Sequence, residues 1–184
     1  MIHEIDDIEQ ELHRISDRPS LAAAPPMLCA FDVAVKGDVA EYQARIKSVL
    51  HITLELALSE SLDGDDLSVS RIPEWFAGVS GDTSLPVPDS ARSGAQRYIS
   101  AIDGGAWKLQ EWLYQFDPDS EFRGWAWWDL TPLGDGRVRI WVDTWGESFF
   151  ACDELRWLAF TSGADEISGP TLARTDEWAS SINP

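Results

Sequence analysis

The chain has 184 residues, a length that fits one domain or one domain with a short arm. Hydrophobic residues make up 44% of it, which is enough for a packed core and argues against general disorder. The 32 acidic and 14 basic residues give a net charge of −18 at pH 7. The negative electrostatic field of such a charge repels nucleic acids and anionic lipids, which proteins bind mainly through Lys and Arg. We therefore expect neither as a partner.

The sequence carries no signal for membrane insertion, secretion or metal binding. No apolar run approaches the roughly 18 residues of a membrane span, and the N-terminus is acidic where a secretory signal would be basic. The cysteines Cys29 and Cys152 lie in apolar runs and are expected to be buried thiols. The histidines stand at no metal-ligand spacing. We therefore expect a cytoplasmic protein with no metal site and no cofactor.

Residues 1–18 predict an amphipathic helix, followed by a single α+β domain over residues 19–184. Apolar residues recur at helical spacings of three, four and three, at Ile5, Ile8, Leu12 and Ile15. An Arg-Pro pair then ends the pattern. A narrow stripe of this kind docks either on its own domain or on a second copy of the chain. The second case would make a homodimer through this helix.

The first half of the domain predicts one strand and several helices. After the Pro/Ala-rich linker, the run 27–35 has the apolar composition of a strand. Segment 39–62 fits either one long helix or a helix followed by a strand, and its Leu, Glu and Ala content favours the single helix. Shorter helices are expected over 73–81 and 91–102.

The second half predicts an antiparallel β-meander, a helix and a loop-rich tail. Segments 106–116, 123–130 and 137–145 are rich in residues that favour strands, and a Gly-Asp-Gly turn lies between the last two. Segment 149–160 predicts a helix, and 161–184 is expected to be mostly loop with a short turn near 175–181. The fold class is therefore α+β, with the meander packed against several helices.

Residues 125–145 hold five tryptophans and three aspartates, of which Asp129 and Asp143 lie in the predicted strands. Because side chains alternate along a strand, Val138, Ile140 and Val142 are expected to face the core. The same alternation predicts that the other face carries indoles and carboxylates, in a register that sequence alone does not fix. These predicted binding residues are Trp125, Trp127, Asp129, Trp141, Asp143 and Trp145, with Glu147 at the strand end.

Three interpretations of this segment remain open. Cross-strand aromatic pairs could simply stabilise the sheet, with Arg137 and Arg139 neutralising the aspartates. Alternatively, indoles beside carboxylates would suit a basic protein, because tryptophan attracts Arg and Lys and is enriched at binding hot spots. Finally, the same groups could stack on a sugar or another flat ligand in a cleft beside the sheet.

The sequence contains no established catalytic motif. It has no nucleophile elbow, P-loop or dinucleotide fingerprint, and we can assign neither a serine nor a cysteine to His51 as a nucleophile. Asp129 and Asp143 could in principle form a glycosidase-like pair, but 32 acidic residues make chance pairs common. We therefore favour a binding protein over an enzyme.

The composition resembles that of immunity proteins, which neutralise basic toxins, although no motif supports the resemblance. By this analogy, we expect the acidic, tryptophan-rich surface to capture a basic protein partner. The alternatives are a small-ligand-binding protein or enzyme with a closed cleft that holds buried carboxylates, and a self-associating structural domain.

Overall fold

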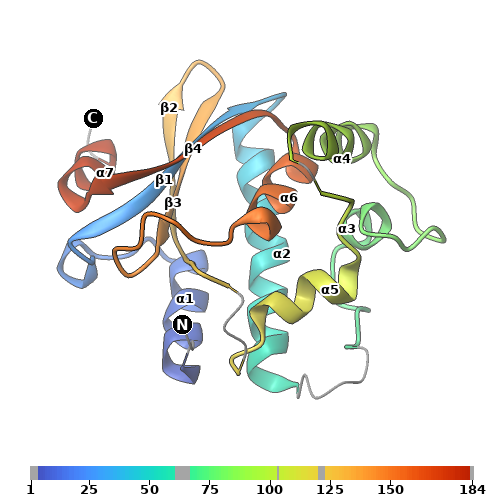
Figure 1. The fold of residues 1–184 in the computed structure, drawn as a ribbon, viewed down its shortest axis with the longest axis horizontal. Coiled ribbons are helices and arrows are strands. Elements are labelled where there is room, and N and C mark those ends of the chain that lie inside the picture. Colours follow the sequence, from blue (N-terminus) through green and yellow to red (C-terminus); the bar gives the residue numbers. More distant parts are fainter. Residues whose placement is uncertain (1–3, 61–66, 103, 120–122, 183–184) are drawn as a thin grey trace.

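The structure is a computed structural model that describes residues 4–60, 67–102, 104–119 and 123–182. Its strands form one antiparallel sheet, and helices surround that sheet (Figure 1). In chain order, the elements are α1 (Ile5–Ser16), η1 (Leu21–Ala23), β1 (Met27–Val35), α2 (Val39–Ser59), α3 (Glu74–Val79), α4 (Asp89–Ala101), α5 (Leu109–Leu113), η2 (Tyr114–Phe116), β2 (Ala126–Gly134), β3 (Arg137–Asp143), α6 (Asp153–Ser162), β4 (Ala164–Arg174) and α7 (Thr175–Ile182).

The sheet has the strand order β2-β3-β1-β4, and all its neighbouring pairs are antiparallel. A tight turn joins β2 to β3, and its residues Gly134, Asp135 and Gly136 all have positive φ. The central position of β1 requires contacts between the first strand and two strands formed more than 100 residues later. The α+β class, the antiparallel sheet, the strand over 27–35 and the single long helix α2 are confirmed.

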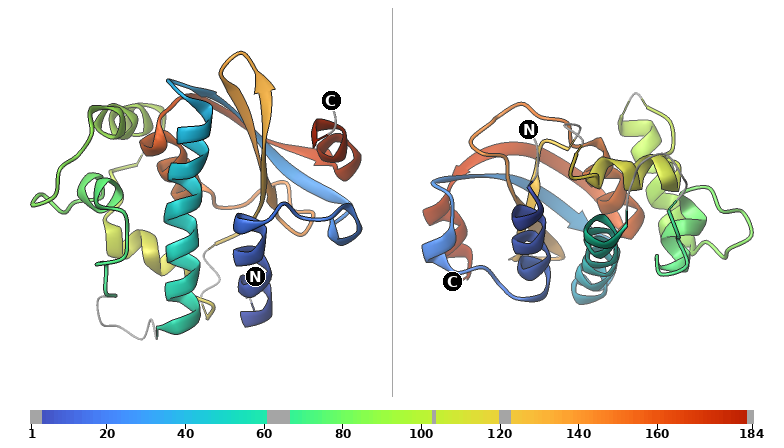
Figure 2. Two further views of the ribbon diagram at one scale, coloured as in Figure 1. Left: turned by 180° about the vertical axis from the view of Figure 1, so that it is seen from behind. Right: turned by 90° about the horizontal axis from the view of Figure 1, so that it is seen from below.

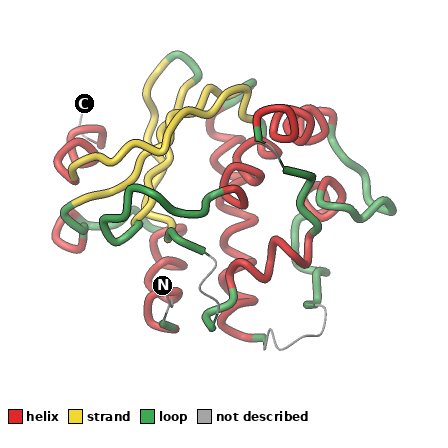
Figure 3. Tube along the Cα trace, viewed as in Figure 1, coloured by secondary structure: helices red, strands yellow, loops and turns green. Residues whose placement is uncertain are grey.

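Several segments differ from the sequence prediction, among them α7, which forms where a short turn was expected (Figure 3). Residues 109–116 are helical rather than a strand, because Leu109, Trp112, Leu113 and Phe116 are spaced to bury one face of a helix. The β preference of the aromatic residues yields to that packing. Residues 164–174 form strand β4 where a loop was expected. Their sequence lacks a clear alternation, and the pairing with β1 organises the segment instead.

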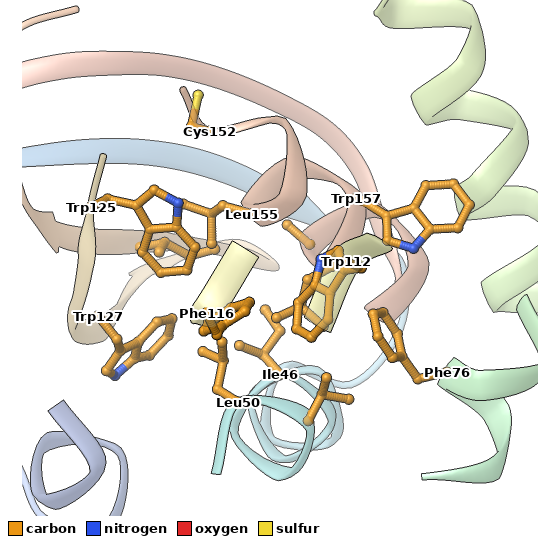
Figure 4. Close-up of a cluster of buried hydrophobic side chains, with 14 of the residues drawn as sticks. Ile46, Leu50, Phe76, Trp112, Phe116, Trp125, Trp127, Cys152, Leu155 and Trp157 are labelled. Atoms are coloured by element: carbon orange, nitrogen blue, oxygen red, sulfur yellow. The ribbon is translucent and has the colours of Figure 1, made fainter. Parts of the chain in front are cut away.

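The main core lies on the face of the sheet that α2, α5 and α6 cover. Trp112 packs against Phe76 and Phe116, with ring centroids 4.7 and 4.8 Å apart. Figure 4 shows Trp125 and Trp127 pointing into this same cluster. Val138, Ile140 and Val142 also belong to it, which confirms the predicted core face of β3.

A smaller cluster lies on the opposite face of the sheet, beneath α7. Trp178 of α7 meets Trp128 edge to face, with ring centroids 5.5 Å apart. Its indole Nε1 donates a hydrogen bond to Asp129 at 3.0 Å. Trp141 is buried in this cluster as well. Both faces of the sheet are therefore covered in the region where sequence alternation predicted one solvated face.

The N-terminal helix docks on its own chain. Ile8 and Ile15 are fully buried, Leu12 is partly buried, and α1 lies alongside α2 on one side of the sheet (Figure 2). The stripe that might have made a homodimer is thus used within the chain, although Ile5 is 61% exposed. Dimerisation through this helix stays a prediction, but most of the apolar surface that it would use is buried within the chain.

Candidate functional site

A β-bulge in β2 determines where the aromatic side chains point. Trp127 pairs with Val142, and the next pair along the strands is Asp129 with Trp141, so Trp128 is an extra residue. An extra residue reverses the alternation of side chains beyond it. As a result, Trp127 faces the main core while Asp129 faces α7.

The prediction that these indoles and carboxylates share one exposed face of the sheet is wrong. Trp125, Trp127 and Trp141 are all 0% exposed, and Asp129 is 3% exposed. The bulge divides these residues between two faces of the sheet, and helices cover both. Arg139 does not neutralise either predicted aspartate: it pairs with Asp32 on the adjacent strand, at 2.9 Å from Nη2 to Oδ2.

Three of the predicted binding residues do come together at the end of β3. Asp143 is the last residue of β3, and Trp145 and Glu147 lie at the start of the β3–α6 loop (residues 144–152). The turn is closed by hydrogen bonds from the Glu147 amide to the Thr144 carbonyl at 3.0 Å, and from the Thr144 hydroxyl to the Glu147 carbonyl at 2.7 Å. The loop follows a buried strand directly, so its position is fixed at that end.

The turn holds Trp145 in an unusual backbone conformation. Its φ is +54° and that of Gly146 is +83°, so both central residues have the positive φ of a type I′ turn. Glycine adopts this region freely, whereas a bulky residue there is an outlier that costs on the order of 1–3 kcal/mol. The amide of Trp145 donates a hydrogen bond to Asp143 Oδ1 at 2.9 Å, which helps to hold the turn.

Aromatic and acidic side chains of this loop reach solvent together. Trp145 is 38% exposed, Phe149 is 95% exposed, and Glu147 is exposed between them. Phe150, the next residue, packs edge to face on Phe31 at 6.3 Å. The loop thus has one anchored ring beside a ring that is almost fully in water.

The carboxylate of Asp143 borders helix α1. Burial raises its pKa above the ordinary value, while the hydrogen bond from Trp145 and the charge of Arg14 act to lower it. Asp7 and Glu11 of α1 act in the same direction as burial, because nearby negative charges disfavour a further carboxylate. The loop and α1 therefore share a locally negative field.

Comparison with known proteins does not assign a function to this chain. No known protein family, curated protein sequence or solved structure matches it. The site must therefore be judged from its own geometry.

The buried carboxylates are structural rather than part of an open cleft. Glu11 accepts two hydrogen bonds from Arg123, at 2.7 and 2.8 Å, and one from the Trp127 amide at 2.6 Å. Glu154 accepts from the indole Nε1 of Trp125 at 2.5 Å. Like Asp129, both are satisfied by donors in the core, and they do not line the hollows described below.

Glu154 gives a test of this core that depends on pH. Burial raises its pKa above the ordinary value of about 4.3, despite the hydrogen bond from Trp125 and the charge of Arg123. The folded protein therefore holds this proton more tightly than the unfolded chain, so the contribution of Glu154 to stability falls as pH rises from about 4.3 through the raised pKa.

Glu154→Gln keeps the acceptor for Trp125 but has no charge to bury. We expect its free energy of unfolding, relative to the wild type, to increase between pH 4 and pH 8. Every unit by which the folded pKa exceeds the unfolded one is worth about 1.4 kcal/mol. Urea unfolding at several pH values measures the difference, and a difference independent of pH would contradict it. Glu111→Gln on the exposed surface is the control.

Two hollows flank the elements around the loop. One, of about 430 Å³, lies between the loop and β4 and is lined by Phe149, Cys152, Arg156 and Pro170. The other, of about 540 Å³, lies between α4 and β4.

Burial raises the pKa of the Cys152 thiol to about 11, so the thiol is a weak nucleophile. Cys29 is buried too, which confirms the expectation for both cysteines.

Within the described residues, no group of three or more His, Cys, Asp or Glu side chains could hold a metal ion. None of the helices in this part of the chain is both long and apolar enough to cross a lipid bilayer.

Phe149 is the exposed residue that sequence reasoning missed. It was assigned to a helix over 149–160, whereas α6 begins at Asp153. The acidic pair Asp153 and Glu154 was a usable signal, because acidic residues favour the first turn of a helix and the preceding aromatic pair then falls in the loop. The burial of Trp141 and Asp129 could not have been predicted, since it depends on α7 and on a bulge with no sequence signature.

Proposed function

We propose that this chain is a non-enzymatic binding protein that captures a basic protein through the β3–α6 loop, in the manner of an immunity-type inhibitor. The observation that carries the proposal is the joint exposure of Trp145 and Phe149 beside the carboxylates of Asp143 and Glu147. An exposed aromatic pair with acidic neighbours suits Arg and Lys side chains of a partner.

The strained turn supports this proposal. Ordinary turns place Gly or Asn at positive φ, and Trp145 occupies such a position at an energetic cost. Strain of this kind tends to persist where a side chain must be presented in one direction. A rigid indole also loses little conformational entropy on binding, which makes it an efficient anchor.

The net charge of −18 adds long-range attraction for a basic partner. Charge would speed the encounter, and the aromatic pair would supply the contact area that slows dissociation. The mechanism is therefore occlusion of a basic surface, with no bond made or broken.

We expect Trp145→Ala and Phe149→Ala each to weaken binding by about 30-fold or more, because central aromatic anchors are typically worth about 2 kcal/mol or more. Isothermal titration calorimetry against basic proteins encoded by neighbouring genes measures the affinity, at low and at moderate salt. Neither substitution changes the net charge, so a loss cannot be attributed to electrostatic steering.

Two controls complete this experiment. Ile99→Ala removes an exposed apolar side chain on α4, 47% exposed, and should leave the affinity unchanged. Glu147→Gln should mainly slow association and reduce its dependence on salt. A tight complex that tolerates both aromatic substitutions would show that this loop is not the contact surface.

A further inference from the structure

Strand β4 forms an edge of the sheet, and among the residues that the structure describes it is hydrogen-bonded to another strand only along its β1 side. Edge strands carry a row of backbone donors and acceptors that can pair with another chain, and proteins usually protect them. The protection of β4 is uneven along its length. This difference makes one short stretch of the edge a candidate docking surface.

The outward backbone groups of β4 follow from two hydrogen bonds of β1. Val35 N donates to Gly136 on the β3 side, and Lys36 N donates to Gly163 on the β4 side. Because these directions alternate along β1, its even-numbered residues bond to β4. Their partners on β4 turn their backbone groups inward. The backbone groups of Ile167, which is opposite the odd-numbered Val33, consequently point away from the sheet.

The middle and the C-terminal end of β4 are protected. Arg156 donates a hydrogen bond to the Gly169 carbonyl at 2.9 Å, and Pro170 has no N–H to offer. The Arg174 amide is bound by the Glu177 carboxylate at 3.1 Å. Residues 165–168 have no such cover from another backbone segment in the described part of the chain.

A groove runs beside this open stretch. It has a volume of about 540 Å³ and lies between α4 and β4, with Phe160 and Ile167 as apolar lining. Asp165 and Glu166 also line it, and Arg97 of α4 pairs with Asp165 at 2.8 Å. Glu166 has no ion pair within the described residues, so it is available to a cationic side chain.

We propose that residues 165–168 accept an extended, Lys/Arg-rich segment of the partner as an added β-strand. Main-chain hydrogen bonds would supply affinity, and the carboxylates and groove would select basic and apolar side chains in alternation. A second copy of the chain fits poorly, because it would bring another charge of −18 to the same edge. The inference rests on the proposed function for its basic partner.

The edge and the β3–α6 loop are close enough for one partner to use both. Pro170 of β4 lines the same hollow as Phe149 of the loop. A segment bound along residues 165–168 would therefore continue toward the exposed aromatic pair. The two contacts nevertheless involve different residues and can be tested separately.

The probe is a synthetic eight-residue peptide of alternating lysine and valine. It is compared with a copy that is N-methylated at the amides that would face β4. Both have the same charge, but only the first can complete a ladder of hydrogen bonds. We expect the methylated copy to bind at least 10-fold more weakly. Amide hydrogen exchange should slow at Ile167 with the first peptide alone.

A matched pair of variants tests the edge from the protein side. Ile167→Pro removes the outward N–H, and Ile167→Ala removes a similar amount of side chain but keeps that N–H. We expect the proline variant to lose at least 10-fold in affinity for the unmethylated peptide, and the alanine variant to stay within threefold of the wild type. If the proline variant does not fold, the comparison of the two peptides still decides the matter.

Equal binding of the two peptides would overturn the proposal, because charge alone would then explain the attraction. So would a dimer in sedimentation analysis that Ile167→Pro dissolves, since a second copy would then occupy the edge. Loss of peptide binding in Trp145→Ala, without any effect of Ile167→Pro, would support the proposed function and reject the strand addition. The reverse pattern would support the strand addition alone.

Discussion

Replacing Glu11 by glutamine is expected to lower the free energy of unfolding by about 3–5 kcal/mol, the usual cost of breaking a buried ion pair. Glu11 and Arg123 are 0% exposed and joined by two hydrogen bonds. Arg123 also lies over the rings of Phe116 and Trp125, at 4.5 and 5.2 Å from their centroids. The substitution leaves the guanidinium buried with a donor facing it, and urea denaturation measures the loss.

The control is the double variant Glu11→Leu with Arg123→Met, which removes both charges. We expect it to be markedly more stable than either single variant, because apolar replacement of a whole buried pair is often neutral or better. Glu154 supplies a further check, since its charge also acts on Arg123. Combining Glu11→Gln with Glu154→Gln should cost more than the sum of the two changes. Simple additivity would mean that Arg123 does not depend on these carboxylates.

Replacing Trp178 by alanine is the second change with a large expected effect, again about 3–5 kcal/mol. Trp178 is 0% exposed, covers Trp128, and donates to the buried Asp129. Its removal leaves a cavity and also deprives a buried carboxylate of a donor. Arg18, which contacts Asp129 at 3.1 Å, would remain as a partner.

Trp178→Phe separates these two contributions. The phenyl ring keeps much of the contact with Trp128 but cannot donate to Asp129, so the remaining loss should be about 1.5–3 kcal/mol, as for hydrogen bonds to charged groups. Urea unfolding gives the totals, and hydrogen exchange shows where protection is lost. If Trp178→Ala leaves the unfolding midpoint unchanged and only the amides of α7 exchange faster, the helix opens on its own and does not stabilise the sheet.

Local pattern was sufficient to predict the elements that carry a clear period. The stripe from Ile8 to Ile15 predicted α1, and the alternation at Val138, Ile140 and Val142 predicted the core face of β3. Residues 109–116 were misassigned because amino-acid preference was given more weight than the spacing of their apolar residues. Strand β4 has little pattern of its own and takes its structure from β1.

The candidate site was only partly predictable for a related reason. Asp143 lies in the last residue pair of the hairpin, opposite Ala126, and Trp145 and Glu147 follow it in the loop, so the bulge in β2 does not reorient them. Trp127, Asp129 and Trp141 lie within the hairpin, and their positions depend on a single inserted residue and on a helix some 40 residues later. Such long-range choices leave no trace in a short window of sequence.

The central position of β1 has a consequence for biosynthesis. Met27–Val35 emerges from the ribosome more than 100 residues before its neighbours β3 and β4. The nascent chain must therefore keep this apolar strand from unsuitable contacts until β3 and β4 have been translated. Formation of the sheet is expected to wait for these strands, and ribosome-stalled chains that end before residue 164 should remain sensitive to protease.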